Sequence, residues 1–161
     1  ADHVSGTDRV QEAIAALDAE IVVNVQGDEP LLDPRVIDAV VAPLLRDAGI
    51  SVVTAAAPLC GDPSVSSVVK VVLDHRGDAL YFSRAPIPSG GPWLHHIGLY
   101  AFRRAALDAF VARDPEAFRE TWRFHALDTR RGWAPPRDGR ARPRVAPVQR
   151  PACLPSQMTD L

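Results

Sequence analysis

The sequence predicts an α/β domain from two features: the order of its expected strands and helix, and its length together with its hydrophobic content. Runs rich in β-branched and small apolar residues at 21–25 and 50–57 lie on either side of a stretch whose apolar residues have helical spacing. A strand, a helix and a strand in this order are typical of a right-handed parallel crossover. The chain has 161 residues, 47% of them hydrophobic, which is enough for one ordinary core. We therefore expect a single α/β unit.

The first expected helix covers residues 7–17, where apolar side chains recur on one helical face. Its entrance, Ser5-Gly6-Thr7, offers hydroxyl caps and backbone amides. Amides at a helix N-terminus can bind an anion or the polar edge of a ligand, although an ordinary helix cap explains the same residues. Both interpretations are open at this point.

A second helix is expected to begin at Asp33-Pro34, because a cap residue followed by proline is typical of a helix start. Gly49 can end it. Its core face consists of apolar residues three and four positions apart: Val36, Ile37, Val40, Val41 and Leu44.

Residues 68–73 and 79–82 predict two strands, and the polar residues 74–77 between them predict a hairpin turn. Lys70, the one lysine of the chain, lies in the first of these strands. It could point toward a phosphate or cap a solvated sheet edge, and we favour the edge, where lysine is common. Residues 93–102 predict another strand, and residues 105–111 a helix with Leu107 and Phe110 inward.

The pattern changes after residue 118. Residues 1–118 carry nine Lys and Arg against sixteen Asp and Glu, whereas residues 119–161 carry nine arginines against four acids, together with six prolines. Composition of this kind, without a helical or strand period, does not build a core. We expect one domain at 1–118 and an Arg/Pro-rich tail at 119–161 that is disordered or frame-shifted. An arginine tail can also bind nucleic acid, but we expect no such partner.

Composition also bears on location. No segment approaches the roughly 20 apolar residues of a membrane span, and no signal peptide opens the chain. We expect a soluble, cytoplasmic protein without a membrane partner. Cys60 and Cys153 form no metal-ligand spacing, and we expect both to be free thiols.

The most informative stretch is Val22 to Pro30, where an apolar strand ends in a glycine followed by two acids. In an α/β sheet, ligands collect at the carboxyl ends of strands. Gly27 allows close approach of a ligand to the backbone, and Asp28 can supply an oxygen to a metal-bound phosphate, with Glu29 the lesser candidate. A solvated turn carrying two acids is the alternative.

This stretch and three further blocks, in the same order and spacing, resemble the CMP-Kdo synthetase (3-deoxy-manno-octulosonate cytidylyltransferase) family. The blocks are Ala1 to Arg9, Ala79 to Pro88 and His96 to Tyr100. The resemblance covers residues 1 to about 118, and four collinear blocks are far more specific than one motif. It implies a Rossmann-like nucleotidyltransferase fold of the nucleotide-diphospho-sugar transferase type.

The resemblance implies a reaction in which the anomeric hydroxyl of the sugar acid Kdo attacks the α-phosphate of CTP, giving CMP-Kdo and pyrophosphate for lipopolysaccharide biosynthesis. Mg²⁺ is the implied cofactor, with Asp28 as its ligand. The substrate-binding residues implied for the nucleotide are Ser5, Gly6, Arg9, Gln26 and Gly27. A strand-end amide that satisfies nearby backbone is the alternative for Gln26.

For the sugar acid, the resemblance implies Arg84, His96 and Tyr100, with Arg84 and His96 acting as catalytic residues beside Asp28. A guanidinium suits a carboxylate, and its alternative is a surface salt bridge. His96 and Tyr100 lie four apart on an extended segment and so share one side, although core packing would explain them equally well. We expect these three residues to converge on one surface, close to Asp28.

Two family features are absent from the sequence: the loop that holds the triphosphate and a later segment with a second metal-binding Asp. We therefore expect an incomplete enzyme without turnover, and the resemblance implies a homodimer for its full-length form. A CMP-sialate-type cytidylyltransferase is the alternative enzyme, and a non-catalytic fragment or binding module is the alternative from another class.

Overall fold

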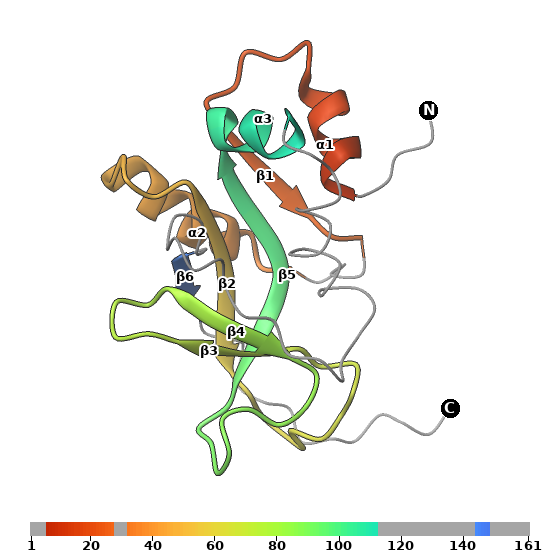
Figure 1. Ribbon diagram of the computed structural model, residues 1–161, viewed down its shortest axis with the longest axis vertical. Coiled ribbons are helices and arrows are strands. Elements are labelled where there is room, and N and C mark those ends of the chain that lie inside the picture. The colour runs from red at the N-terminus through yellow and green to blue at the C-terminus, as the bar shows by residue number, and fades with distance from the viewer. Residues whose placement is uncertain (1–5, 28–31, 113–143, 149–161) are drawn as a thin grey trace.

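The protein is represented by a computed structural model, which describes residues 6–27, 32–112 and 144–148 (Figure 1). The described residues form a mixed α/β structure. In chain order the elements are α1 (Gly6–Ile14), β1 (Ile21–Val25), α2 (Pro34–Arg46), β2 (Val52–Pro58), β3 (Lys70–Leu73), β4 (Ala79–Ser83), β5 (Leu94–Arg103), α3 (Arg104–Ala112) and β6 (Arg144–Pro147).

The long strand β5 organises the sheet. It pairs antiparallel with β2 along its length, with β1 over its C-terminal half and with β3 near its start. The strand order is β4-β3-β5-β2-β6, with β1 joined to β5 beside this path. β1 and β2 therefore run parallel to each other, as the expected crossover requires, but β5 lies between them. The α/β class is confirmed, and the sheet is mixed.

One face of the sheet packs against α2, which begins as the sequence predicts. The side chain of Asp33 accepts a hydrogen bond from the amide of Arg35 at 2.9 Å and caps the helix. The helix ends at Arg46, before Gly49. Its buried residues and those beneath it are all aliphatic: Val36, Val40, Leu44, Val53, Ala55, Ala57, Ile97, Leu99, Ala101, Ala146 and Val148.

Arg103, at the end of β5, binds the C-terminal end of α2 and the residues that follow it. Its Nε donates to the carbonyl of Ile50 at 2.8 Å, and its Nη2 donates to the carbonyls of Leu44 and, at 3.1 Å, Asp47. The Leu44 carbonyl is one of the last four of the helix, so the guanidinium satisfies a polar group that the helix end leaves unpaired. The side chain thus joins the helix end to the sheet.

On the opposite face, α1 and α3 lie together over one end of β5 (Figure 1). Arg104 joins them: its guanidinium donates to the carbonyls of Ile14 and Leu17 at 3.2 and 3.0 Å and pairs with Asp108. The apolar cluster beneath comprises Val22, Tyr100, Phe102 and Leu107, with Val10 and Ile14 against it. The side chain of Phe110 lies outside the described residues.

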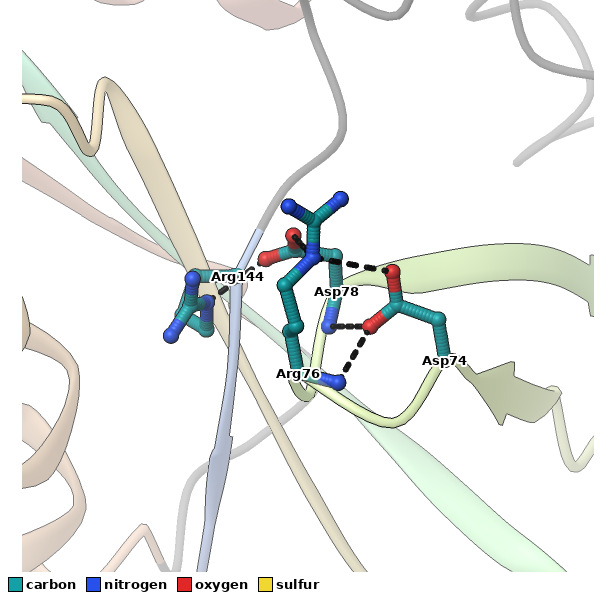
Figure 2. A network of polar contacts seen from close by, with 4 residues as sticks. All are labelled: Asp74, Arg76, Asp78 and Arg144. Atoms are coloured by element: carbon teal, nitrogen blue, oxygen red, sulfur yellow. Dashed lines mark hydrogen bonds and ion pairs between the residues drawn. The ribbon is translucent and has the colours of Figure 1, made fainter.

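The β3–β4 hairpin crosses the other end of the sheet and reaches β6 (Figure 1). Asp78 in its turn bridges to Arg144, whose Nε lies 2.6 Å from Asp78 Oδ1 (Figure 2). Asp74 Oδ1 accepts from the amides of Arg76 and Asp78 at 2.8 and 3.0 Å, and the Asp78 amide is the main cause of the lowered pKa of Asp74. The turn needs Gly77, whose φ is 84°. β4 and β6 stand at opposite ends of the strand order, and this bridge brings the turn of the hairpin against β6.

Several expectations need correction. Lys70 does not cap a solvated edge: it is fully buried, on a strand with neighbours on both sides. Residues 144–148 are packed, with Val145 and Ala146 buried against β2, so the expectation of an unpacked tail is wrong for this segment. Other residues of the 119–161 tail lie outside the described ranges.

Two further expectations concern the cysteines and membrane-spanning segments. Cys60 is disulfide-bonded, so the expectation of a free thiol there is wrong; Cys153 lies outside the described residues. None of the helices that the structure describes is long and apolar enough to cross a membrane.

Candidate functional site

The predicted site residues come from four parts of the fold. Gly6 and Arg9 lie on α1, Gln26 and Gly27 follow β1, and Arg84 follows β4. His96 and Tyr100 lie on β5. Ser5, Asp28 and Glu29 lie outside the described residues, so their predicted roles are not tested.

The sequence did not single out Thr54, which holds His96 in place. The hydroxyl of Thr54 lies 2.8 Å from the carbonyl of Leu99 and 2.8 Å from Nε2 of His96. A carbonyl can only accept, so the single hydroxyl proton goes to Leu99 and Thr54 accepts from His96. This arrangement places a proton on Nε2 of the imidazole. The available signal was one hydroxyl in the otherwise apolar run of residues 52–57.

Aromatic rings fix the plane of the His96 ring. Phe82 meets it edge-on, with centroids 4.9 Å apart at 75°, and Tyr100 lies 5.4 Å away at 53°. His96 and Tyr100 thus lie together on one side, as predicted. These two residues are only 6% and 5% exposed, so both also belong to the core.

Burial raises the pKa of Tyr100 far above its ordinary value of 10.0. The phenol therefore remains neutral throughout the physiological pH range. It can donate or accept a hydrogen bond, but it cannot serve as an anionic base.

The side chain of Gln26 lies against Gly98, which stands between His96 and Tyr100 on β5. A Cβ on Gly98 would lie 2.5 Å from Oε1 and 2.9 Å from Cδ of Gln26, closer than real Cβ contacts allow. The Gln26 side chain therefore packs directly on the backbone of β5, between His96 and Tyr100 in sequence. Three predicted site residues thus gather around Gly98.

Arg84 lies at the end of β4, two strands from His96. Lys70 is the partner of both Ser83 and His95, and the amide of His96 donates to the carbonyl of Val69 at 2.8 Å. Extending this register by one residue places Arg84 and His96 on either side of Val69. Two strand spacings put their α-carbons about 10 Å apart. Phe82, two residues before Arg84, meets the His96 ring, and the chain bends at Arg84 as it leaves β4.

The remaining predicted residues are not joined to this group by a described contact. Arg9 is exposed on α1, whose Val10 and Ile14 pack on the cluster that contains Tyr100. Within residues 6–27, 32–112 and 144–148, no group of three His, Cys, Asp or Glu side chains could hold a metal ion. The predicted proximity of Arg84 and His96 to Asp28 is not tested.

Comparisons with known proteins agree with one another. A family model described as cytidylyltransferase matches residues 1–131, which extends past residue 118. The 3-deoxy-manno-octulosonate cytidylyltransferase of Chloroherpeton thalassium is 44% identical over 133 residues, covering 76% of this chain and 54% of that protein. The protein of the same name from Chromohalobacter salexigens is 49% identical over 129 residues, covering 68% and 50%.

A solved structure of CMP:2-keto-3-deoxy-manno-octonic acid synthetase complexed with CTP is also similar to this chain. Its TM-score is 0.71 at 32% identity, and the match covers 92% of this chain and 61% of that one. The chain spans about half the length of the curated relatives that it matches.

Proposed function

The chain belongs to the cytidylyltransferase family, and from this we propose that it acts in the transfer of a cytidylyl group from CTP to Kdo. The products are CMP-Kdo and pyrophosphate. The observation that carries the proposal beyond the family is the grouping of Gln26, His96 and Tyr100 around Gly98, with Arg84 directly after the neighbouring strand β4. The names of the similar proteins support Kdo and CTP as the substrates.

The roles follow from the chemistry of each group. Kdo carries one carboxylate and many hydroxyls, so its site needs a fixed cation and hydrogen-bonding groups. We assign the carboxylate to Arg84, whose planar fork matches it, and sugar hydroxyls to His96 and Tyr100. Thr54 orients His96 for this task.

On the nucleotide side, we assign the ribose or base to Gln26. The backbone at Gly27 and the α1 entrance at Ser5, Gly6 and Arg9 complete the proposed nucleotide site. Helix amides suit a polar ligand edge, and Gly27 permits close approach.

Mg²⁺ is the proposed cofactor, and Asp28 its proposed ligand. A hard cation takes oxygen ligands, and when bound it neutralises phosphate charge during transfer. Asp28 follows Gln26, the proposed ribose or base ligand, by two residues in the sequence. In a full-length form of the enzyme, Asp28→Asn should lower turnover by orders of magnitude and leave the fold intact. Near-normal turnover of that variant would remove Asp28 from the site.

The wider setting is also proposed. CMP-Kdo formation would serve lipopolysaccharide biosynthesis in the cytoplasm of a Gram-negative bacterium. A homodimer remains our expectation for the full-length protein, and light scattering during size-exclusion chromatography measures it.

The experiment that tests the function is titration of the ¹⁵N-labelled chain with Kdo, using N-acetylneuraminate as a matched acidic sugar. We expect Kdo to shift the resonances of Arg84, His96 and Tyr100, and the sialic acid to shift them less. Larger shifts with N-acetylneuraminate would favour a CMP-sialate-type enzyme. No shift at these residues with either sugar would reject the sugar-site assignment.

Turnover is measured separately. We expect no pyrophosphate release by the 161-residue chain, because it spans only about half the length of the curated relatives that it matches. Release from CTP that requires both Kdo and Mg²⁺ would contradict this expectation and favour the enzyme over a binding module.

A further inference from the structure

Lys70 is the largest fully buried side chain among the described residues. A buried ammonium must find hydrogen-bond acceptors, because taking a charge out of water is costly. Its Nζ donates to the carbonyls of Val68 at 2.7 Å, of Val65 at 3.3 Å, and of Arg84. These three bonds use all three N–H groups of the ammonium.

Through these acceptors Lys70 joins two segments that lie just outside the paired strands β3 and β4. Val65 and Val68 belong to the loop between β2 and β3, and Arg84 begins the segment after β4. Burial is the main cause of a lowered pKa for Lys70, while the nearby Asp62 acts in the opposite direction. The side chain is fully occupied within the protein, and so it is not a phosphate ligand.

The backbone around Arg84 is held at two points. The Arg84 carbonyl accepts from Lys70, and the next amide, that of Ala85, donates to Oγ of Ser83 at 2.9 Å. The chain bends at this place, as it leaves β4. The direction in which the Arg84 side chain leaves the sheet is therefore set by backbone that Lys70 restrains.

We propose that Lys70 is a positioning residue for Arg84, holding the backbone that directs the guanidinium toward a carboxylate ligand. The inference rests on the proposed function, because that function assigns the sugar carboxylate to Arg84. A prepositioned fork binds a carboxylate more tightly than a mobile one, since less side-chain freedom is lost on binding. Loss of Lys70 should then weaken binding of the sugar acid without removing any group that touches it.

The test compares Kdo dissociation constants of the 161-residue chain by NMR titration for Lys70→Met, Arg84→Met and the double variant. We expect Lys70→Met to weaken Kdo binding about tenfold, the scale of one impaired charge-assisted hydrogen bond. In the Arg84→Met background, Lys70→Met should cause no further loss, because it acts through Arg84. CTP affinity should not change in Lys70→Met.

Arg103 is a matched control. It also donates to three backbone carbonyls, but it lies at the C-terminal ends of β5 and α2. Arg103→Met should lower the midpoint of urea unfolding and leave Kdo affinity unchanged. A general loss of stability would weaken Kdo binding equally in both variants, and that outcome would overturn the inference. So would an independent, additive loss in the double variant.

A second readout does not depend on Kdo. The side-chain Nε–H resonance of Arg84 should move toward that of a mobile arginine in Lys70→Met, and an unchanged resonance would overturn the proposal. If the wild-type chain does not bind Kdo but this resonance moves in Lys70→Met, the positioning role stands and the proposed function fails.

A second variant is available if Lys70→Met does not fold. In Lys70→Gln the amide fills the site of the ammonium and donates at most two of its three hydrogen bonds. Wild-type Kdo affinity and an unchanged Arg84 resonance in folded Lys70→Gln would overturn the proposal.

Discussion

The two faces of the sheet are built differently. The buried cluster under α2 consists of aliphatic side chains, whereas the opposite face buries Thr54, His96 and Tyr100 among its apolar residues. Burial of aliphatic groups stabilises a fold without directing chemistry. Buried polar groups cost free energy unless each is hydrogen-bonded, and here Thr54 satisfies two partners at once. The polar face is therefore where we expect ligand recognition, and the α2 face is where we expect stability.

The largest expected effect is on the aliphatic face. Leu44→Ala should lower the free energy of unfolding by about 2–5 kcal/mol, because Leu44 is fully buried and its removal leaves a cavity. Urea denaturation measures the change. Kdo affinity of the folded variant should stay constant; a weakened affinity would show that the two faces are not separate in function.

On the polar face, Thr54→Val should cost about 1–3 kcal/mol, because it leaves the Leu99 carbonyl and Nε2 of His96 without their shared partner. Thr54→Ser is the control, since it keeps the hydroxyl and should cost less. The ¹⁵N shifts of the His96 ring should report a proton on Nε2 in the wild type and in Thr54→Ser. A proton on Nδ1 alone in the wild type would contradict the hydrogen-bond assignment.

Tyr100 predicts an alkaline limit to stability. Its folded pKa is raised above the ordinary 10.0, so above pH 10 the unfolded phenol loses a proton that the folded one retains. The contribution to stability is complete below pH 10 and falls above it by about 1.4 kcal/mol per pH unit. Unfolding curves between pH 9 and 11 should show this slope, reduced in Tyr100→Phe. Equal slopes in both proteins would assign the alkaline transition to other groups.

The smallest expected effect lies in the hairpin network of Figure 2. Asp78→Asn removes the charge partner of Arg144, and both side chains are partly exposed. We expect a loss of about 0.5–1 kcal/mol that shrinks as salt is added. A loss above about 3 kcal/mol would mean that the β4–β6 bridge is as important as the aliphatic face.

Local pattern predicted most of the elements but not their neighbours. α2, the β3–β4 hairpin and β5 form within a few residues of the predicted ranges, because each has its own periodicity or turn signal. The insertion of β5 between β1 and β2 could not be predicted, since strand order depends on contacts between distant segments. β6 was missed for a related reason: its four residues have no period and gain burial only beside β2.

The candidate site shows the same division. His96 and Tyr100 were placed together from their spacing of four, and the structure confirms their contact. The roles of Thr54 and Lys70 could not be assigned from the sequence, because each depends on a backbone carbonyl from another segment. Spacing reveals which side chains share a strand face, whereas it does not reveal which loop carbonyls will surround a buried group.

The pairing of β6 with β2 has a consequence for the order in which the molecule assembles. Val53 on β2 pairs with Arg144 on β6, and these partners are separated by most of the chain. Forming such a contact requires closing a long loop. The chain loses conformational entropy on closure before the strand pairing stabilises the structure. The hairpin turn, by contrast, joins near neighbours. We therefore expect β6 to dock last and to open first, with its amides exchanging with solvent sooner than those of β5.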